Sequence, residues 1–384
     1  MNKFIISSII FLLIIILINL IIKMNNNNYN NKNNNKIFPI RTKKELPKKL
    51  KIGYTNWYEV DEKIYESVEN GINIIIWFSI DLISHPETKK PFISRGLNYE
   101  KLSKITKKIK ENNYNVINLI SIGGWNSPHL DISHSAEEYF EAFLEFNKNI
   151  SNNFFDGFDG IDWDIEGNDD LNSKFNYFSY EELNLIGELS KLFHENNFIV
   201  SMAPAESYLD YTNSNFNLSL KNNYSEWEKI NLKFNYHGNN CYAYIISKFG
   251  LEIFDFVSIQ LYEGYSHALF RYLKSKEKIG KIFEDLIVNL EKGFYVNFEF
   301  GKKLIKINKE KIVIGIANAW ANEIKEKFLF INEDDLIEGI KYLKDKNIEF
   351  RGFMFWNIFD EGKIVQDKNG NKKKFYLSKI INNI

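Results

Sequence analysis

The chain has 384 residues, 44% of them hydrophobic and 26% charged, which is typical of a globular protein with a sizeable core. Lys and Arg total 49 against 50 Asp and Glu, so no basic excess exists to neutralise phosphates, which excludes nucleic acid as the main partner. A single cysteine, Cys241, excludes an internal disulfide and therefore an attached cysteine-stapled module.

The N-terminus carries the first predicted element. Residues 4–22 are almost wholly apolar and lie between Lys3 and Lys23, which predicts a secretory signal peptide over residues 1–23. The same run is long enough to span a bilayer, so an uncleaved membrane anchor is the alternative. Both interpretations predict a secreted or anchored extracellular protein that touches a membrane only through this segment. The Asn- and Lys-rich tract that follows has no apolar periodicity and predicts a disordered linker over residues 24–47.

Residues 48–384 are predicted to form one α/β domain. Amphipathic runs with helical spacing cover Tyr99–Glu111, Ala136–Ile150, Tyr180–Glu195 and Asp334–Lys344. Apolar runs with strand character cover residues 51–57, 72–79, 116–124, 158–166, 198–204, 254–262, 311–317 and 350–356. This alternation predicts a (β/α)8 TIM barrel with extended loops. A doubly wound sheet would also alternate, but it would want an early Gly-rich phosphate turn, which the sequence lacks.

The segment FDGIDWDIEG, residues 158–167, carries the strongest functional signal. Asp162, Asp164 and Glu166 alternate with apolar residues, so in a strand the three acids share one face. Carboxylates crowded on one face repel each other, which favours a role in proton chemistry. A calcium or magnesium site is a competing interpretation, although metal loops prefer flexible Gly and Asn spacing, and we expect no metal. A solvated edge strand is disfavoured by the large apolar residues on the other face.

Three aromatic residues fall at or just after the ends of predicted strands, as Glu166 does. They are Trp125, Tyr262 and Trp356. For each ring alone, core packing is the simpler interpretation. In a TIM barrel, however, the carboxyl ends of all the strands meet at one face, where active sites are built. The joint placement therefore predicts a single site at that face.

Several of these segments resemble one known family. Residues 159–166, DGIDWDIE, resemble the Asp-x-x-Asp-x-Asp-x-Glu signature of the family 18 chitinases, and residues 121–125, SIGGW, resemble the third-strand segment of the same family. Weaker similarities to its first, fifth, sixth and eighth strands lie at residues 53–57, 202–204, 260–262 and 352–356. The resemblance covers nearly everything after the linker, and the layout is similar to the short secreted chitinases of malaria parasites.

The resemblance implies a chitinase that hydrolyses β-1,4 bonds between N-acetylglucosamine units of chitin and chito-oligosaccharides with retention and without a cofactor. Glu166 would be the general acid and then the base, with a pKa raised to ~6. The N-acetyl oxygen of the substrate would be the nucleophile, oriented by Asp164. Asp162 would share a proton with Asp164 as a coupled pair. Tyr262 would donate its hydroxyl to the acetamido carbonyl.

Further residues receive supporting roles from the resemblance. Trp356 would be the floor on which the distorted sugar stacks. Asp159 precedes the regular alternation and is expected to be a structural hydrogen-bond acceptor. The remaining candidate substrate contacts are Gln260, Trp125, Tyr54 and Gly124.

The sequence also leaves rival functions open. An endo-β-N-acetylglucosaminidase acting on N-glycans would use the same motif. A non-catalytic chitin-binding lectin on the same barrel would lack the acid at the position of Glu166, which is present. Residues 318–349 must supply a helix and are too few for the α+β insertion of some family members. This predicts a shallow groove and endo-type, non-processive cutting.

Overall fold

The computed structural model describes residues 41–55, 62–94, 96–220, 240–367 and 370–384. The predicted leader, most of the predicted linker, and Asn56 and Trp57 of the first-strand similarity lie outside the described residues. Within the described part of the chain, no helix is both long and apolar enough to cross a membrane.

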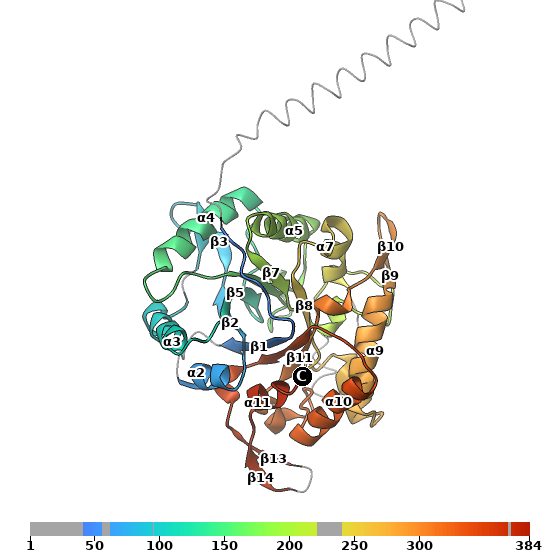
Figure 1. Ribbon diagram of the computed structural model, residues 1–384. Coiled ribbons are helices and arrows are strands. Elements are labelled where there is room, and N and C mark those ends of the chain that lie inside the picture. The colour runs from blue at the N-terminus through green and yellow to red at the C-terminus, as the bar shows by residue number, and fades with distance from the viewer. Residues whose placement is uncertain (1–40, 56–61, 95, 221–239, 368–369) are drawn as a thin grey trace, which may run out of the picture. The chain divides into compact units, whose positions relative to one another are not determined.

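The centre of the molecule is a closed barrel of parallel strands (Figure 1), which confirms the predicted fold. Its order is β1-β12-β11-β8-β7-β6-β5-β2, so each strand pairs with its neighbour in the chain and the first pairs with the last. The strands are β1 (Leu50–Thr55), β2 (Ile74–Ile80), β5 (Ile117–Gly124), β6 (Gly160–Ile165), β7 (Ile199–Met202), β8 (Phe256–Gln260), β11 (Ile312–Ala317) and β12 (Gly352–Trp356). Six of the eight fall inside the runs predicted from the sequence; β1 begins one residue before its run, and β2 extends one residue beyond its run.

Helices surround the strands (Figure 1). They are α2 (Glu62–Glu69), α3 (Tyr99–Glu111), α4 (Ala136–Ile150), α5 (Tyr180–Glu195), α7 (Cys241–Phe249), α8 (His267–Leu273), α9 (Ile279–Lys292), α10 (Glu333–Asp345) and α11 (Leu377–Ile381). Two of them begin sharply because Ser135 and Ser179 form capping boxes with Glu138 and Glu182, which satisfy free backbone N–H groups in the first turns of α4 and α5. Short 3-10 turns cover Lys174–Asn176, Glu206–Tyr208, Lys309–Lys311, Ala319–Ile324 and Ile358–Asp360.

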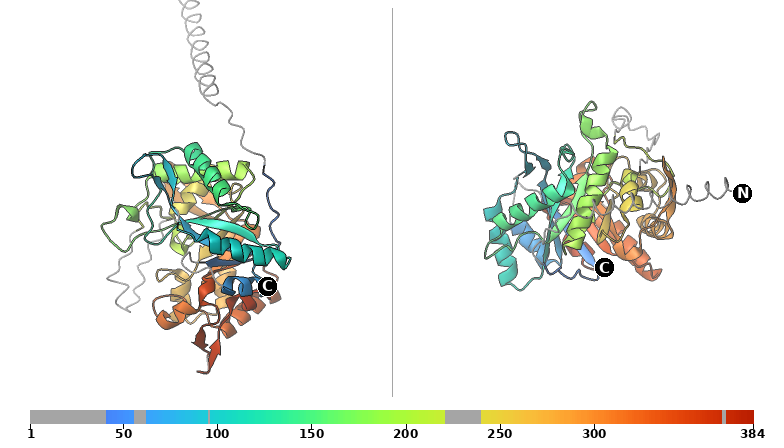
Figure 2. Two further views of the ribbon diagram at one scale, coloured as in Figure 1. Left: turned by 90° about the vertical axis from the view of Figure 1, so that its left-hand side faces the viewer. Right: turned by 90° about the horizontal axis from the view of Figure 1, so that it is seen from above.

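Three antiparallel hairpins extend the loops. They pair β3 (Leu82–Ser84) with β4 (Pro91–Ile93), β9 (Phe294–Phe298) with β10 (Gly301–Ile305), and β13 (Ile364–Gln366) with β14 (Lys372–Lys374). The dark red β13–β14 hairpin projects from the barrel in Figure 1 and in the left view of Figure 2. The segment 318–349 contains a 3-10 turn and α10 but no sheet, as its length predicted.

The segment 42–47 belongs to the same compact unit as the barrel, so the folded unit begins six residues before the predicted boundary at residue 48. Lys43 pairs with Asp255 at 2.7 Å, Lys44 pairs with Asp159 at 2.9 Å, and Leu46 packs against the barrel core. Asp159 and Asp255 immediately precede β6 and β8. The segment therefore lies across the amino ends of the strands, and these contacts explain why it is ordered.

Candidate active site

Strand β6 places its acids and its apolar residues on opposite faces, as the alternation predicted. Trp163 is fully buried, and its indole N–H donates to the Ser190 hydroxyl of α5 at 2.8 Å, so this face meets the helices. Asp162 instead contacts side chains of β1 and β7 in the barrel interior. Asp164 follows on the same face, and Glu166 lies one residue beyond the carboxyl end of the strand.

Asp162 is the most deeply buried of the three acids. One of its oxygens accepts a hydrogen bond from the Tyr54 hydroxyl and the other accepts one from the Ser201 hydroxyl. Burial raises the pKa of Asp162 to about 6, although both hydrogen bonds act in the opposite direction. Tyr54 is itself buried, and it reaches Asp162 from β1, three strands away around the barrel. The proton shared between Asp162 and Asp164 stays a prediction.

Asp164 is held by Gln260, which ends β8. The Gln260 amide nitrogen donates to Asp164 Oδ1 and to the Ala203 carbonyl, both at 2.7 Å. Because both partners are acceptors, the amide nitrogen faces them, and the amide oxygen has no hydrogen-bond partner among the described residues. Burial and the charges of Glu166 and Asp162 raise the pKa of Asp164 well above its ordinary value.

Glu166 is 7% exposed at the carboxyl end of the barrel. Burial, followed by the charge of Glu263, raises the pKa of Glu166 to about 8. The shift has the predicted direction and exceeds the predicted value. Burial and the charge of Asp164 likewise raise the pKa of Glu263 to about 8. Glu263 was missed in the sequence, although it directly follows Tyr262 at the end of a barrel strand, where an acid could have been noticed.

Tyr262 and Trp356 lie near these acids, and a third aromatic residue joins them. Burial, followed by the charges of Glu263 and Asp164, raises the pKa of the Tyr262 phenol well above its ordinary value, so the phenol stays a hydrogen-bond donor. Trp320 meets the Tyr262 ring edge to face at a centroid distance of 6.1 Å. Trp320 is half-buried and follows β11 by three residues, which the sequence analysis did not use.

Trp356 ends β12 and keeps part of its ring exposed. Its ring centroid is 5.7 Å from that of Tyr54 and 4.9 Å from that of Phe78. Gly124 has a φ of +109°, and a Cβ there would lie 2.2 Å from the Phe78 ring. Gly124 therefore leaves room for Phe78 to reach Trp356. Phe78 was another residue missed by sequence reasoning.

A buried polar network holds the backbone of Trp356. Its carbonyl accepts from the Asn318 backbone N–H at 2.8 Å and from the Trp320 indole N–H at 2.7 Å. The Asn318 amide nitrogen donates to the Asn357 carbonyl at 2.8 Å and to the Glu361 carboxylate at 3.0 Å. Glu361 also accepts from the Leu377 backbone N–H at 2.8 Å, which links α11 to the site.

Trp125 lies beside the residue that follows Glu166. Its indole N–H donates to Asp169 at 2.9 Å, and a Cβ on Gly167 would come within 3.3 Å of its ring. The structure thus places Trp125, Tyr54, Gly124 and Gln260 around the acids or the residues beside them, and their contacts with substrate stay a prediction. Asp159 is different, because it immediately precedes β6 at the opposite end of the barrel, where it accepts from the Asn118 backbone N–H at 2.9 Å and from Lys44.

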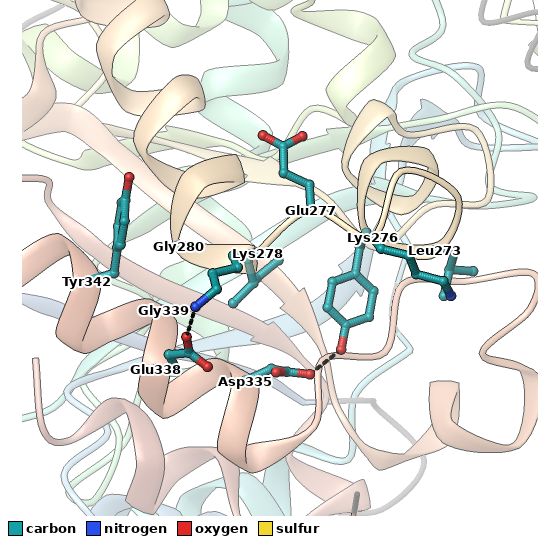
Figure 3. A pocket seen from close by; sticks show the side chains of 11 residues that line it. Leu273, Lys276, Glu277, Lys278, Gly280, Asp335, Glu338, Gly339 and Tyr342 are labelled. Atoms are coloured by element: carbon teal, nitrogen blue, oxygen red, sulfur yellow. Dashed lines mark hydrogen bonds and ion pairs between the residues drawn. The ribbon is translucent and has the colours of Figure 1, made fainter.

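A separate pocket lies on the outside of the barrel between α10 and the junction of α8 and α9 (Figure 3), and none of the acids above line it. Some of its polar groups pair with each other: Lys278 meets Glu338 at 2.7 Å, and the Tyr272 hydroxyl donates to Asp335 at 2.5 Å. Across the described ranges, no group of three or more His, Cys, Asp or Glu side chains is arranged to hold a metal ion.

Solved structures with the same fold include two chitinases and one further bacterial domain. The C-terminal domain of ChiA from Legionella pneumophila has a TM-score of 0.55 at 13% identity, covering 80% of this chain and 93% of that one. Chitinase ChiC from Aspergillus fumigatus has a TM-score of 0.53 at 14% identity, covering 83% and 95%. A family 18 chitinase from Chromobacterium violaceum has a TM-score of 0.52 at 14% identity, covering 82% and 80%.

The sequence matches neither a protein-family model nor a curated protein. At 13 to 14% identity, the likeness to the solved structures concerns the fold, and the chemistry has to be argued from the site residues. The chain shares the barrel fold of these chitinases.

Proposed function

We propose that this protein is a family 18 chitinase, a retaining and substrate-assisted glycoside hydrolase that cuts β-1,4 bonds between N-acetylglucosamine units. The observation that carries the proposal is the place of Glu166, which is buried just beyond the carboxyl end of β6, where barrel active sites are built, on the strand face that carries Asp164 and Asp162. Burial and the charge of Glu263 raise its pKa to about 8, which favours the protonated carboxyl group at neutral pH. A glycosidase needs such a neutral acid to protonate its leaving group.

The first step breaks the glycosidic bond. Glu166 gives its proton to the glycosidic oxygen, and the bond between that oxygen and the anomeric carbon breaks. The acetamido oxygen of the same sugar forms a new bond to the anomeric carbon, which yields a cyclic oxazolinium-like intermediate. Because the sugar supplies the attacking atom, no carboxylate has to reach the anomeric carbon.

The second step restores the enzyme. Glu166, now a carboxylate, accepts a proton from water, and the resulting oxygen nucleophile attacks the anomeric carbon. The bond to the acetamido oxygen breaks and the acetamido group is re-formed. Two displacements at one carbon return the original configuration, so the product retains the β-anomer.

The neighbouring side chains suit the supporting roles. Asp164 accepts from the acetamido N–H and stabilises the developing positive charge, while Gln260 fixes its carboxylate from behind. Asp162 adds negative potential from below, and Tyr262 donates to the acetamido carbonyl. The unpartnered amide oxygen of Gln260 is available to accept a hydrogen bond from a sugar group.

The aromatic residues suit sugar binding. Trp356 is half-buried and makes edge-to-face contacts with Tyr54 and Phe78, so its ring is held in place and suits a platform for the face of a sugar. The short segment 318–349 builds no extra wall beside it, which supports endo-type cutting. The predicted leader supports secretion, and a secreted enzyme has access to an extracellular polymer such as chitin.

One experiment tests the proposal. Wild type and Glu166→Gln are incubated separately with a chito-oligosaccharide and with a high-mannose glycoprotein, and Glu145→Gln on the exposed face of α4 is the matched control. We expect wild type and the control to cleave the chito-oligosaccharide with β-anomeric product, and Glu166→Gln to lose about 100-fold or more in rate. Cleavage of the glycoprotein alone would instead identify an endo-β-N-acetylglucosaminidase. Binding of chito-oligosaccharide without cleavage would identify a lectin.

A further inference from the structure

The backbone of Glu166 lies just beyond the last paired residue of β6. The pairing of β6 with β5 ends at Ile165 opposite Gly124, so the sheet register stops one residue before the acid. Side chains from outside the sheet therefore have to fix its position. One of them is Tyr242 of α7, whose hydroxyl accepts from the Ile165 N–H at 2.8 Å and donates to the Ile165 carbonyl at 3.1 Å.

A second anchor reaches Glu166 itself. The loop after β5 carries His129, and its Nε2 lies 2.9 Å from the Glu166 carbonyl oxygen. A carbonyl oxygen only accepts, so Nε2 carries a hydrogen in every ring state that makes this bond. The two residues are 37 positions apart in the sequence. The His129 bond holds the chain at Glu166, one residue after the point where Tyr242 holds it.

The His129 ring has little freedom to move. It is 4% exposed and stacks on Phe178 at a centroid distance of 4.8 Å, with Phe175 at 5.5 Å. Its Nδ1 lies 3.5 Å from Glu182 Oε1, and the other Glu182 oxygen accepts from the Ser179 N–H at the start of α5. Aromatic stacking therefore fixes the plane of the ring and the direction of Nε2, whereas Nδ1 has no hydrogen-bond partner among the described residues.

The same loop also holds the residues that follow Glu166. The Asn126 backbone N–H donates to the Gly167 carbonyl at 3.0 Å, and the Asn126 side chain exchanges hydrogen bonds with Asp169. The loop 125–129 is thus a support for the segment 166–169, and His129 is the member that contacts the acid's own backbone.

We propose that His129 is a positioning residue that holds Glu166 in its working place through the Glu166 carbonyl. The inference rests on the proposed function, in which Glu166 must meet the glycosidic oxygen. The carboxyl group of Glu166 is attached to this backbone, so a displaced backbone moves the carboxyl group away from the leaving oxygen. Displacements of about 1 Å in an active site cost on the order of 100-fold in rate.

The test compares two substitutions of His129 that differ in one N–H. His129→Phe keeps a ring between Phe175 and Phe178 but removes the donor, whereas His129→Gln places an amide N–H near the position of Nε2. We expect His129→Phe to lower kcat on a chito-oligosaccharide about 10- to 100-fold while KM changes less than about 3-fold, and His129→Gln to recover most of the loss. His134→Phe, which changes a histidine that contacts Ser84 in the same loop region, is the matched control.

A second measurement does not depend on catalysis. Hydrogen–deuterium exchange of the peptide 163–170 should be about 10-fold faster in His129→Phe than in wild type and nearly unchanged in His129→Gln. If wild type cleaves no chito-oligosaccharide, the proposed function fails. The exchange rates still show whether His129 holds the backbone of Glu166. Should His129→Phe fail to fold, His129→Asn replaces it, because its shorter amide cannot reach the Glu166 carbonyl. Unchanged kcat and exchange, or an equal loss in His129→Gln, would overturn the inference.

Discussion

Replacing Glu166 with Gln is expected to stabilise the folded protein by an amount that grows with pH. Burial holds the pKa of Glu166 at about 8 in the folded chain, against roughly 4.3 for an unfolded glutamate. Between these values the folded state keeps a proton that the unfolded state has lost, so the stability of wild type falls as pH rises. Gln has no titrating proton, so the loss of folding stability with rising pH that Glu166 causes is absent from the variant.

The magnitude follows from the shift. A single group titrating in this way would lower the unfolding free energy by about 3 to 4 kcal/mol between about pH 5 and about pH 8. Because the charges of Glu263 and Asp164 are coupled to that of Glu166, we expect about 1 to 3 kcal/mol. Urea unfolding of wild type and Glu166→Gln at both pH values gives the quantity directly. Glu145→Gln, which removes a charge from the exposed face of α4, should show no such change.

The reasoning has a definite point of failure. If the difference in unfolding free energy between Glu166→Gln and wild type is the same at both pH values, Glu166 does not hold a proton against the solvent. The general-acid role would then lose its physical basis, even if the variant were inactive.

Three further substitutions probe other parts of the structure. Lys44→Met leaves the buried Asp159 without its ion pair and should lower the unfolding free energy by about 1 kcal/mol in urea titrations, with kcat/KM unchanged. Gly124→Ala would drive a Cβ into Phe78 at a positive φ, so thermal melting should show a loss of about 2 kcal/mol or more, together with a raised KM. Trp320→Ala removes an aromatic surface beside Tyr262 and should raise KM for chito-oligosaccharides about 3- to 10-fold in initial-rate assays; an unchanged KM would separate this ring from sugar binding.

The barrel could be predicted because its elements are long and regular. Each strand is an apolar run bounded by polar residues, and the runs Tyr99–Glu111, Ala136–Ile150 and Tyr180–Glu195 match α3, α4 and α5 residue for residue. The acids of β6 could be placed for the same reason, since the alternation of residue types fixes which side of a strand each one faces. Two of the hairpins were missed because β3, β4, β13 and β14 have three residues each, too few to show a pattern, and the five-residue strands β9 and β10 were missed as well.

The supports of the site could not be predicted, because their partners are distant in sequence. The Tyr242 hydroxyl meets Ile165 across 77 positions, and nothing in α7 distinguishes this tyrosine from a packed core ring. His129 lies in a loop without periodicity, and its role appears only when the loop is seen against Glu166. Glu263 is intermediate: its place after a strand end was readable, but its effect on Glu166 depends on the distance that the closed barrel sets.

The Glu361 carboxylate has a consequence for the time course of synthesis. It joins the Asn318 side chain, which lies next to the Trp356 backbone, to the first residues of α11, so the backbone of Trp356 is fully braced only when α11 has docked. The acids of β6 leave the ribosome about two hundred residues earlier, a delay on the order of 10 to 40 seconds at ordinary rates of translation. During that interval a nascent chain carries the acids of β6 without the brace that Glu361 and α11 give to Trp356.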